Sequence, residues 1–539
     1  MKTGTAMMPA CPASNTARLS ETESVLLSAA SGTLRRRLCV DDVVAPLSLL
    51  GADSLGVIEL TAAVEDALGV NVPQDLAHES ITIRELAAWI DGSAPRSSTQ
   101  ALESDPFEQM FADAVLPDDV RPGIGHSGVG LLEGRNILLT GATGFLGAQL
   151  AADLLARSTA RLHCIVRPGA EAPEKRLRRR LIENGADAFT VSSRVSTIEA
   201  DLARPHLGLD AASRERLAAT IDRVLHVGAS VNWIAPYAAL RASNVQSTLE
   251  LLRLACGPVP IPFHFVSSLS VCYAVDGPPE VDESYDPLPH LRNVHLGYAQ
   301  TKVVAEALVR EAARRGLPVR IYRPSLISGH SRSGAFNPDD LLSLLIRGCI
   351  RMGLAPDLDW RLDCEPVDIV SAGILRLSSQ DEQTTHLAHV RPRHWRECLL
   401  WMRVTGHDVR LVPYQEWLEH LDAAIAACPD HPLRSLRTFF LSRPARGLTL
   451  PELYEDRRRT RASSVRTNLR LQHLERPGLD ASLLDRYFTA YYEAGYLPST
   501  TSRGAHRSPP SQASALDETF FEAALAARGR HGTSATRAG

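Results

Sequence analysis

The stretch Thr140-Gly141-Ala142-Thr143-Gly144-Phe145-Leu146-Gly147 decides the fold of the larger part of this 539-residue chain. It directly follows an apolar run, 137–139, and it opens a helical stretch, 148–156. Glycines at this spacing, GxxGxxG, allow a tight turn and let a pyrophosphate reach the helix N-terminus, where free backbone N–H groups bind anions. The motif therefore predicts a strand–turn–helix unit that binds a dinucleotide, with a purely structural turn as the alternative. The predicted cofactor contacts are Gly141, Thr143, Gly144, Phe145, Leu146 and Gly147.

Strand-like and helix-like stretches alternate on from this motif. Short apolar runs at 137–139, 162–166, 195–200, 224–227, 263–266 and 319–322 are separated by helical patterns. Alternation of this kind predicts an α/β, Rossmann-like, doubly wound parallel sheet. After Pro324 the sequence is mixed and mostly helical up to about residue 498, which predicts a mostly helical C-terminal subdomain.

The first 95 residues differ in charge from the rest of the chain. They carry 6 basic and 12 acidic side chains, which leaves 52 and 50 for the remainder. Ser20 with Glu23, and Thr82 with Glu85, match the pattern of a helix capping box. These features predict a small, acidic, all-α bundle. The formal net charge of −4, with no basic excess, argues against a nucleic-acid-binding protein.

Within this bundle, Ser54 lies in the sequence Gly-Ala-Asp-Ser-Leu, ahead of a helical pattern. Here the sequence resembles the acyl and peptidyl carrier proteins of polyketide and nonribosomal peptide assembly lines. The resemblance implies that Ser54 carries covalent 4′-phosphopantetheine, and a helix N-terminus suits a phosphodiester. The alternative is that Asp53 or Ser54 is only a helix N-cap.

The residue after the second predicted strand distinguishes the two nicotinamide dinucleotides. An NAD site places Asp or Glu there, about 20 residues after the glycines, to bind the ribose 2′-hydroxyl. This chain has Arg167 instead, which can pair with a 2′-phosphate, so the sequence predicts NADPH. Arg176 is a second candidate for the phosphate. For residues 178–180 we favour a solvated basic helix face.

Tyr298 and Lys302 lie four residues apart in Tyr-Ala-Gln-Thr-Lys and share one face of a predicted helix. An ammonium beside a phenol lowers the pKa of the phenol, which suits proton transfer. Lysine is rare in this chain, because only Lys2, Lys175 and Lys302 are lysines among 58 basic residues. Arginine is too bulky and rigid to act as a compact ammonium there. The scarcity therefore supports a specific chemical task for Lys302.

The glycine motif and the Tyr-x-x-x-Lys pair together resemble the short-chain dehydrogenase/reductase enzymes. The resemblance implies that the Tyr298 hydroxyl protonates a reduced carbonyl oxygen while Lys302 supports it. It also implies that Ser268, after the fifth strand, polarises the substrate carbonyl. The neighbouring Ser267 has strand-end hydrogen bonding as its simpler interpretation. The further cofactor contacts that the resemblance implies are Asp201, Ala229 and Lys302.

Longer stretches resemble the thioester reductase domains of nonribosomal peptide and polyketide synthetases, of aminoadipate reductase and of carboxylic acid reductases. They are HVGASVNW at 226–233, GYAQTK at 297–302, RPSLISGHS at 323–331, APDLDW at 355–360, PVD at 366–368 and VPYQEW at 412–417. The resemblance implies hydride transfer from NADPH to a thioester on the carrier arm. The product is an aldehyde or, where a second reduction follows, an alcohol, and the sequence leaves the choice between the two open. Ser325 and Val303 depart from the commoner family residues, glycine and a bulky aromatic.

These patterns divide the chain into five predicted segments. They are a flexible N-terminus at 1–19, a carrier domain at 20–92, a linker at 93–133, a reductase domain at 134–498 and a mobile tail at 499–539. Within the reductase, we expect residues 325–498 to form most of the substrate-binding part. Phe107 and Phe111 indicate a short docked helix inside the linker.

The partners expected from the sequence follow from what it lacks. No segment is left for an adenylation domain, so we expect a phosphopantetheinyl transferase and a separate adenylating enzyme or upstream synthase that loads the carrier. Nine scattered cysteines without a CxxC pair predict no metal site and a reduced, cytoplasmic protein. Neither a signal peptide nor a membrane span is visible.

Two other functions stay open on the sequence. One is an epimerase or dehydratase that acts on a carrier-bound group and binds NAD(P) without consuming it. The other is a carrier and docking module whose reductase fold is inactive. Some domains of similar sequence lack the intact catalytic set and release their product by condensation, so the presence of both Tyr298 and Lys302 favours the redox route. The long run after Asn337 separates the resemblance from ordinary sugar epimerases of the same fold.

Overall fold

The structure is a computed structural model, and the parts of the chain that it describes cover most of the two predicted domains. They are residues 19–34, 38–45, 47, 50, 57, 60–61, 63–64, 67–70, 72, 81–92, 105–125, 129–233, 235–389, 391–428, 430–456, 461–462 and 465–498. The predicted phosphopantetheine site at Ser54, the N-terminal residues 1–18 and the tail 499–539 lie outside the described residues.

The N-terminal unit is helical, as predicted. Its described elements are α1 (Glu21–Thr33), η1 (Val40–Val44) and α3 (Ile83–Ile90). Both predicted capping boxes are present, since Ser20 and Glu23 exchange hydrogen bonds at the start of α1 and Thr82 and Glu85 do so at the start of α3. The helices bury apolar side chains against one another, among them Leu26, Val64 and Leu86.

A seven-stranded sheet forms the centre of the larger unit, with the strand order β12-β7-β5-β4-β1-β2-β3. Every neighbouring pair in it is parallel, which confirms the doubly wound sheet. The strands are β1 (Asn136–Thr140), β2 (Arg161–Val166), β3 (Val195–Glu199), β4 (Arg223–His226), β5 (Phe263–Val266), β7 (Val319–Pro324) and β12 (Thr384–Leu387). The sequence predicted six of them and missed β12, whose residues Thr-Thr-His-Leu lack a continuous apolar run.

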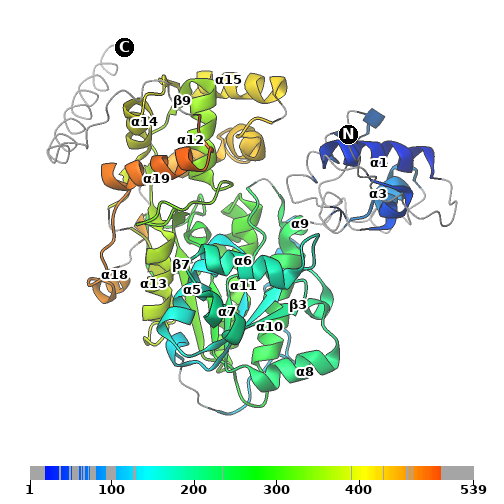
Figure 1. Ribbon diagram of the computed structural model, residues 1–539, viewed down its shortest axis with the longest axis vertical. Coiled ribbons are helices and arrows are strands. Elements are labelled where there is room, and N and C mark those ends of the chain that lie inside the picture. The colour runs from blue at the N-terminus through cyan, green and yellow to red at the C-terminus, as the bar shows by residue number, and fades with distance from the viewer. Residues whose placement is uncertain are drawn as a thin grey trace, which may run out of the picture.

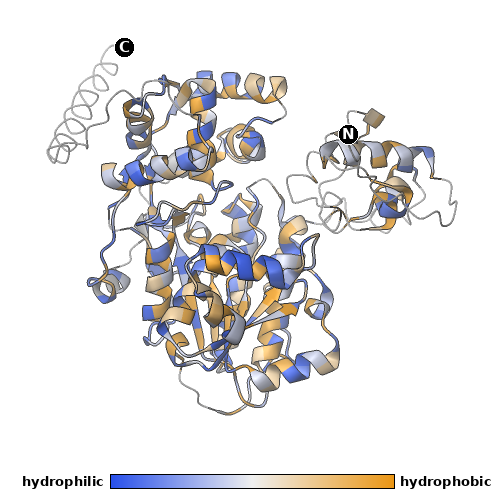
Figure 2. Ribbon diagram, viewed as in Figure 1, coloured by the Kyte–Doolittle hydropathy of each residue, from blue (hydrophilic) through white to orange (hydrophobic). Residues whose placement is uncertain are grey.

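Helices cover both faces of this sheet (Figure 1). Side chains alternate between the faces along a strand, so Leu138 packs with one set of helices and Ile137 and Leu139 with the other. Figure 2 shows the solvent side of α6 as mostly hydrophilic, whereas the strands are hydrophobic. One face is covered by α5 (Phe145–Arg157), α6 (Pro173–Glu183), α7 (Ala188–Arg194) and α13 (Val367–Leu377), and the other by α8 (Ala211–Thr220), α9 (Tyr237–Arg241), α10 (Ser247–Ala255) and α11 (Gly297–Arg314).

Short turns of helix connect these elements. A π-helical turn, η4 (Ala242–Gln246), joins α9 to α10 without a break. The 3-10 turns are η2 (Leu131–Glu133), η3 (Pro205–Gly208), η5 (Leu269–Cys272), η6 (Leu288–Asn293) and η7 (Arg434–Leu436).

The C-terminal part is mostly helical and gathers at one end of the sheet layer (Figure 1). Its helices are α12 (Leu341–Met352), α14 (Trp395–Val404), α15 (Tyr414–Ala427), α16 (Arg437–Leu441), α17 (Leu450–Asp456), α18 (Val465–Arg470) and α19 (Ala481–Glu493). Two-stranded pairs accompany them: β8 (Leu326–Ser328) with β11 (Cys364–Pro366), β9 (Leu354–Asp357) with β14 (Arg410–Pro413), β10 (Arg361–Leu362) with β13 (Arg393–His394), and β6 (Glu280–Val281) with β15 (Arg461–Ala462). The range 325–498 also contains α13 and β12, which belong to the nucleotide-binding layers.

The predicted linker contains a docked helix, α4 (Pro106–Asp113). The Asp113 carboxylate, 5% exposed, accepts hydrogen bonds from Tyr237 Oη at 2.7 Å and from the Arg241 guanidinium at 2.6 Å. The Arg292 guanidinium lies 5.0 Å from the ring centre of Phe107. These contacts fix α4 on α9 and η6, and confirm the docked helix predicted from Phe107 and Phe111.

Among the described residues, no helix combines the length and the apolar character that crossing a membrane requires. No group of His, Cys, Asp and Glu side chains in that part of the chain is arranged to hold a metal ion.

Candidate active site

The glycine-rich turn lies at the carboxyl end of β1 and leads directly into α5. Gly141 has φ +74°, a conformation that side chains with a Cβ rarely adopt. A Cβ atom at Gly147 would lie 2.0 Å from the carbonyl oxygen of Gly141, so only glycine permits this close packing of turn and helix. Gly144 is the N-cap of α5 and is exposed, which leaves the first N–H groups of the helix open to an anion.

The loop after β4 lies beside this turn, because β4 is the neighbour of β1 in the sheet. The strand order reverses between β1 and β4, and ligands of doubly wound folds bind at that point. Ala229, a predicted cofactor contact, lies in this loop and is half-buried. A Cβ at Gly141 would lie 2.7 Å from the backbone nitrogen of Gly228, so the loop and the turn are in direct contact. The residues present thus fit a dinucleotide, since they form a backbone cradle with no room for side chains.

Arg167 and Arg176 meet at the carboxyl end of β2. The Arg176 guanidinium donates a hydrogen bond to the backbone carbonyl oxygen of Arg167. Arg167 itself is an exposed residue. Burial, and then the charge of Arg167, lower the pKa of Arg176. Asp201 follows β3, where its carboxylate accepts the N–H of Ala203 at 3.0 Å. The structure therefore places two arginines where the sequence predicted a 2′-phosphate.

Arg180 corrects part of the sequence interpretation. The solvated helix face expected at residues 178–180 holds for Arg179, which pairs with Glu171 at the surface. The Arg180 Nε instead donates to the carbonyl oxygen of Thr143 at 3.2 Å, within the glycine-rich turn. Sequence reasoning missed this contact because a single basic stretch does not show which arginine faces the turn.

Tyr298 and Lys302 occupy the first two turns of α11. Lys302 Nζ donates to the carbonyl oxygen of Val266, at the end of β5, over 2.9 Å, and lies 6.0 Å from the Tyr298 ring centre. Burial lowers the pKa of Lys302 to about 7, and the charge of Glu306 opposes that shift. Burial raises the pKa of the Tyr298 phenol. The tyrosine is half-buried, and the lysine is 3% exposed.

The two serines after β5 have different environments. The hydroxyl of Ser267, 2% exposed, donates to Glu306 Oε2 at 2.7 Å. Ser268 is half-buried, and its oxygen accepts hydrogen bonds from the N–H and the hydroxyl of Ser270 at 3.1 and 3.0 Å. Because both of these bonds are accepted, the proton of Ser268 stays available to a substrate oxygen.

A buried neutral cluster connects the glycine-rich turn to the helix of Tyr298. We use the name neutral cluster for Thr140, His226, Asn244, Thr248 and Thr301. Thr140 Oγ1 lies 2.7 Å from His226 Nδ1, and His226 Nε2 lies 3.1 Å from Thr248 Oγ1. Thr248 donates to the Asn244 carbonyl oxygen at 2.7 Å, and the Asn244 amide donates to Thr301 Oγ1 at 3.0 Å. The Thr301 hydroxyl then donates to the carbonyl oxygen of Tyr298 at 2.7 Å.

A buried charged cluster also lies near Lys302. We use the name charged cluster for Ser267, Glu306, Arg310, Arg323 and His386. Glu306 accepts Arg323 Nε at 3.1 Å and Arg310 Nε at 2.9 Å, while an Arg323 amino group donates to His386 Nε2 at 3.1 Å. Burial by itself would raise the pKa of Glu306, but the two arginines lower it to about 2. Sequence reasoning singled out Ser267 in this cluster, and Arg323 only within a family stretch, because no local pattern signals pairing over such separations.

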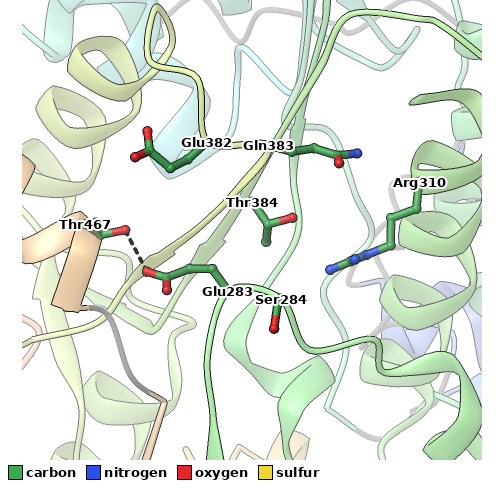
Figure 3. Close-up of a pocket in the computed structure, with 7 residues that line it drawn as sticks. All are labelled: Glu283, Ser284, Arg310, Glu382, Gln383, Thr384 and Thr467. Atoms are coloured by element: carbon green, nitrogen blue, oxygen red, sulfur yellow. Dashed lines mark hydrogen bonds between the residues drawn. The ribbon is translucent and has the colours of Figure 1, made fainter. Parts of the chain in front are cut away.

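A cavity of about 210 Å³ lies beside Arg310 of the charged cluster (Figure 3). Arg310, the start of β12 and α18 contribute to its walls, and Glu283 and Thr467 are joined by a 3.0 Å hydrogen bond across it. None of the predicted site residues lines this cavity. The candidate active site is therefore the carboxyl end of the sheet, where the glycine-rich turn, Ser268, Tyr298 and Lys302 lie.

Comparisons with known protein families agree with the two units. Residues 24–90 match the family described as phosphopantetheine attachment site, and residues 139–374 match the NAD-binding family described as male sterility protein. The isonitrile lipopeptide synthase of Streptomyces coeruleorubidus is 34% identical over 475 residues, which are 86% of this chain and 32% of that protein. The chain thus spans about a third of the length of such curated relatives.

Solved structures give the same result for fold and family. The terminal R domain from the myxalamid PKS-NRPS biosynthetic pathway is 37% identical, with a TM-score of 0.65, and covers 73% of this chain and 100% of its own. A thiolation-reductase di-domain from an archaeal non-ribosomal peptide synthetase, at 20% identity and a TM-score of 0.58, covers 89% of this chain and 99% of its own and shares the fold. The chain therefore belongs to the family of carrier-linked reductase (R) domains of nonribosomal peptide and polyketide synthetases.

Proposed function

We propose that this protein releases an acyl or peptidyl group from its own carrier arm by reducing the thioester to an aldehyde. The observation that carries the proposal is the pairing of Tyr298 and Lys302 on α11, with Lys302 Nζ 6.0 Å from the Tyr298 ring centre and bound to the end of β5. A nicotinamide dinucleotide, when bound in that turn, supplies the hydride. The carbonyl carbon gains a C–H bond, the C–S bond breaks, and the thiol of the arm is freed.

The chain's own residues would position the thioester and manage its proton. Ser268 donates a hydrogen bond to the carbonyl oxygen, and Tyr298 delivers a proton to that oxygen as negative charge develops on it. Burial raises the pKa of the Tyr298 phenol and so keeps the proton in place until then. The Lys302 ammonium stabilises the phenolate that remains. A second equivalent of the reduced nicotinamide dinucleotide, with the same side chains positioning the aldehyde and protonating its oxygen, would give the alcohol.

The proposed nucleotide is NADPH, held by Arg167 and Arg176 at its 2′-phosphate. The two guanidinium groups lie close enough for the charge of Arg167 to lower the pKa of Arg176, and an anion between them would relieve that repulsion. Asp201, Ala229 and the glycine-rich turn would hold the rest of the dinucleotide. The check is the ratio of NADPH to NADH affinity, which Arg167→Ala should reduce more than Arg179→Ala, a change on the exposed face of the same region.

The partners proposed for this chain follow from the carrier domain. A phosphopantetheinyl transferase would modify Ser54, and a separate adenylating enzyme or upstream synthase would load the arm. The cytoplasmic location stays a prediction from the cysteines.

The deciding experiment loads Ser54 with an acyl-phosphopantetheine, adds NADPH, and follows cofactor oxidation together with aldehyde or alcohol release. Stoichiometric oxidation and release support the proposal. A changed acyl group without net oxidation indicates an epimerase or dehydratase, and no turnover with several acyl groups indicates an inactive module. Ser54→Ala should abolish turnover in cis but spare a thioester supplied in trans. Tyr298→Phe should lower kcat about 10²- to 10⁴-fold and leave NADPH affinity nearly unchanged.

A further inference from the structure

His226 is a buried histidine at the carboxyl end of β4, and the mechanism above does not use it. It is 1% exposed, and both of its ring nitrogens have partners in the neutral cluster. Its ring packs against Phe263 and Phe265, with centroids at 6.2 and 5.7 Å. A polar ring in such a place needs both hydrogen bonds to offset its burial, so its orientation is fixed.

The partners of His226 determine the direction of each hydrogen bond. Thr140 Oγ1 accepts the N–H of Val227 at 3.2 Å and of Gly228 at 2.9 Å, so its own proton points to His226 Nδ1. Thr248 gives its proton to the Asn244 carbonyl, so its oxygen accepts the proton on His226 Nε2. The imidazole is therefore neutral, in agreement with the effect of burial, which lowers the pKa of His226 to about 3.

We propose that His226 is a positioning residue for the nicotinamide dinucleotide. By accepting the Thr140 proton it aims the Thr140 oxygen at the N–H groups of Val227 and Gly228. Those two bonds hold the loop after β4 against the glycine-rich turn, where a Cβ at Gly141 would come within 2.7 Å of the Gly228 nitrogen. The inference rests on the proposed cofactor site, because Ala229 and the glycine-rich turn are the proposed contacts of the dinucleotide.

Two substitutions test the hydrogen bonds of the two ring nitrogens of His226 one at a time. In His226→Asn the amide oxygen takes the place of Nδ1, so Thr140 keeps an acceptor. In His226→Gln the amide takes the place of Nε2, so Thr248 keeps a donor and Thr140 loses its acceptor. The measurement is the Kd of NADPH, followed by its fluorescence on the full-length protein without any thioester. His226→Gln should raise the Kd about 3- to 10-fold, the loss expected for one neutral hydrogen bond, and His226→Asn should raise it less.

His264 provides a matched control in the neighbouring strand β5. It is also fully buried, with Nδ1 2.9 Å from Tyr322 Oη and Nε2 2.8 Å from the Val129 carbonyl. Burial lowers its pKa to about 3 as well. Its partners lie away from the glycine-rich turn. His264→Gln should therefore lower the Tm as His226→Gln does, and leave the NADPH Kd within about twofold of the parent.

A double-mutant cycle completes the test. Thr140→Val removes the hydroxyl that His226 orients, so it should raise the Kd as much as His226→Gln, and the double variant should be no worse than Thr140→Val alone. Equal Kd values for His226→Asn and His226→Gln, an unchanged Kd in His226→Gln, or additive losses in the double variant would overturn the proposal. Each result is independent of thioester reduction, so a failure here differs from a failure of the proposed function in the loaded-carrier assay.

Discussion

The neutral cluster and the charged cluster both lie near Lys302, and they stabilise the site in different ways. The neutral cluster contributes no net charge, so His226 does not repel the ammonium. The charged cluster contains a carboxylate, but Arg310 and Arg323 already occupy Glu306, and the lysine bonds to the Val266 carbonyl instead. The difference shows how the ammonium of a buried lysine is kept out of an ion pair. His226 is neutral, and the Glu306 carboxylate is paired with the two arginines instead of with Lys302.

The largest expected effect comes from breaking the charged cluster. Glu306→Gln should lower the free energy of unfolding by about 3–5 kcal/mol, because it leaves Arg323 buried without a counter-charge. The measurement is urea unfolding of the full chain. The matched control on the same helix is Glu311→Gln, whose partners Arg314 and Arg315 are more exposed, with an expected loss of less than about 1 kcal/mol. Similar losses in both variants would show that the buried pairing contributes little.

The next largest effect distinguishes Ser267, which belongs to the charged cluster, from Ser268, which we propose contacts the substrate. Ser268→Ala should reduce kcat about 10²- to 10³-fold with little change in Tm, because it removes a hydrogen bond to the reacting oxygen. Ser267→Ala should mainly lower stability, by about 1–3 kcal/mol, because its hydroxyl serves Glu306. Steady-state kinetics and thermal unfolding of both variants make the comparison. If Ser267→Ala has the larger effect on kcat, the assignment of the two serines is wrong.

The smallest effect separates the clusters by pH. Burial lowers the pKa of folded His226 from 6.5 to about 3. Below pH 6.5 the unfolded chain therefore binds a proton that the folded chain does not, and the free energy of unfolding decreases as the pH is lowered. His226→Asn should remove about 1.4 kcal/mol per pH unit from that slope between pH 5 and 6.

Glu306 titrates in a lower window than His226. Its folded pKa, lowered from 4.5 to about 2, gives stability that is present above pH 4.5 and is lost between pH 4.5 and 2. Glu306→Gln should therefore leave the slope between pH 5 and 6 unchanged. Urea unfolding at several pH values measures both variants, and a slope that stays the same in His226→Asn would contradict a neutral folded histidine.

Local patterns in the sequence predicted the parts of the site that a few neighbouring residues determine. The glycine-rich turn needs its glycines within one strand–turn–helix unit, and Tyr298 and Lys302 share a helix face through their spacing alone. The capping boxes at Ser20 and Thr82 are local in the same sense. Such features appear in the sequence because backbone geometry, rather than tertiary packing, decides them.

The remaining features depend on contacts between distant segments. Glu306 and Arg323 lie on a helix and a strand, and His386 lies on β12, whose polar sequence gave no strand pattern. Arg180 reaches the Thr143 carbonyl across 37 positions, and no periodicity distinguishes it from Arg179. A single sequence does not encode these pairings in any short window, so they emerge only when the sheet order brings the strands together.

The docking of α4 has a consequence for anyone who exchanges this reductase between assembly lines. A cut just before β1 would follow the predicted domain boundary. However, the Asp113 carboxylate and the backbone carbonyls of Leu116, Pro117 and Val120 accept hydrogen bonds from Arg241 and Arg315 of the reductase domain. A unit cut at residue 134 would remove Asp113 from Arg241 and would leave Arg315 with Glu311 but without its three backbone acceptors. The transplantable module therefore begins ahead of Asp105, and a fusion joint belongs upstream of that residue.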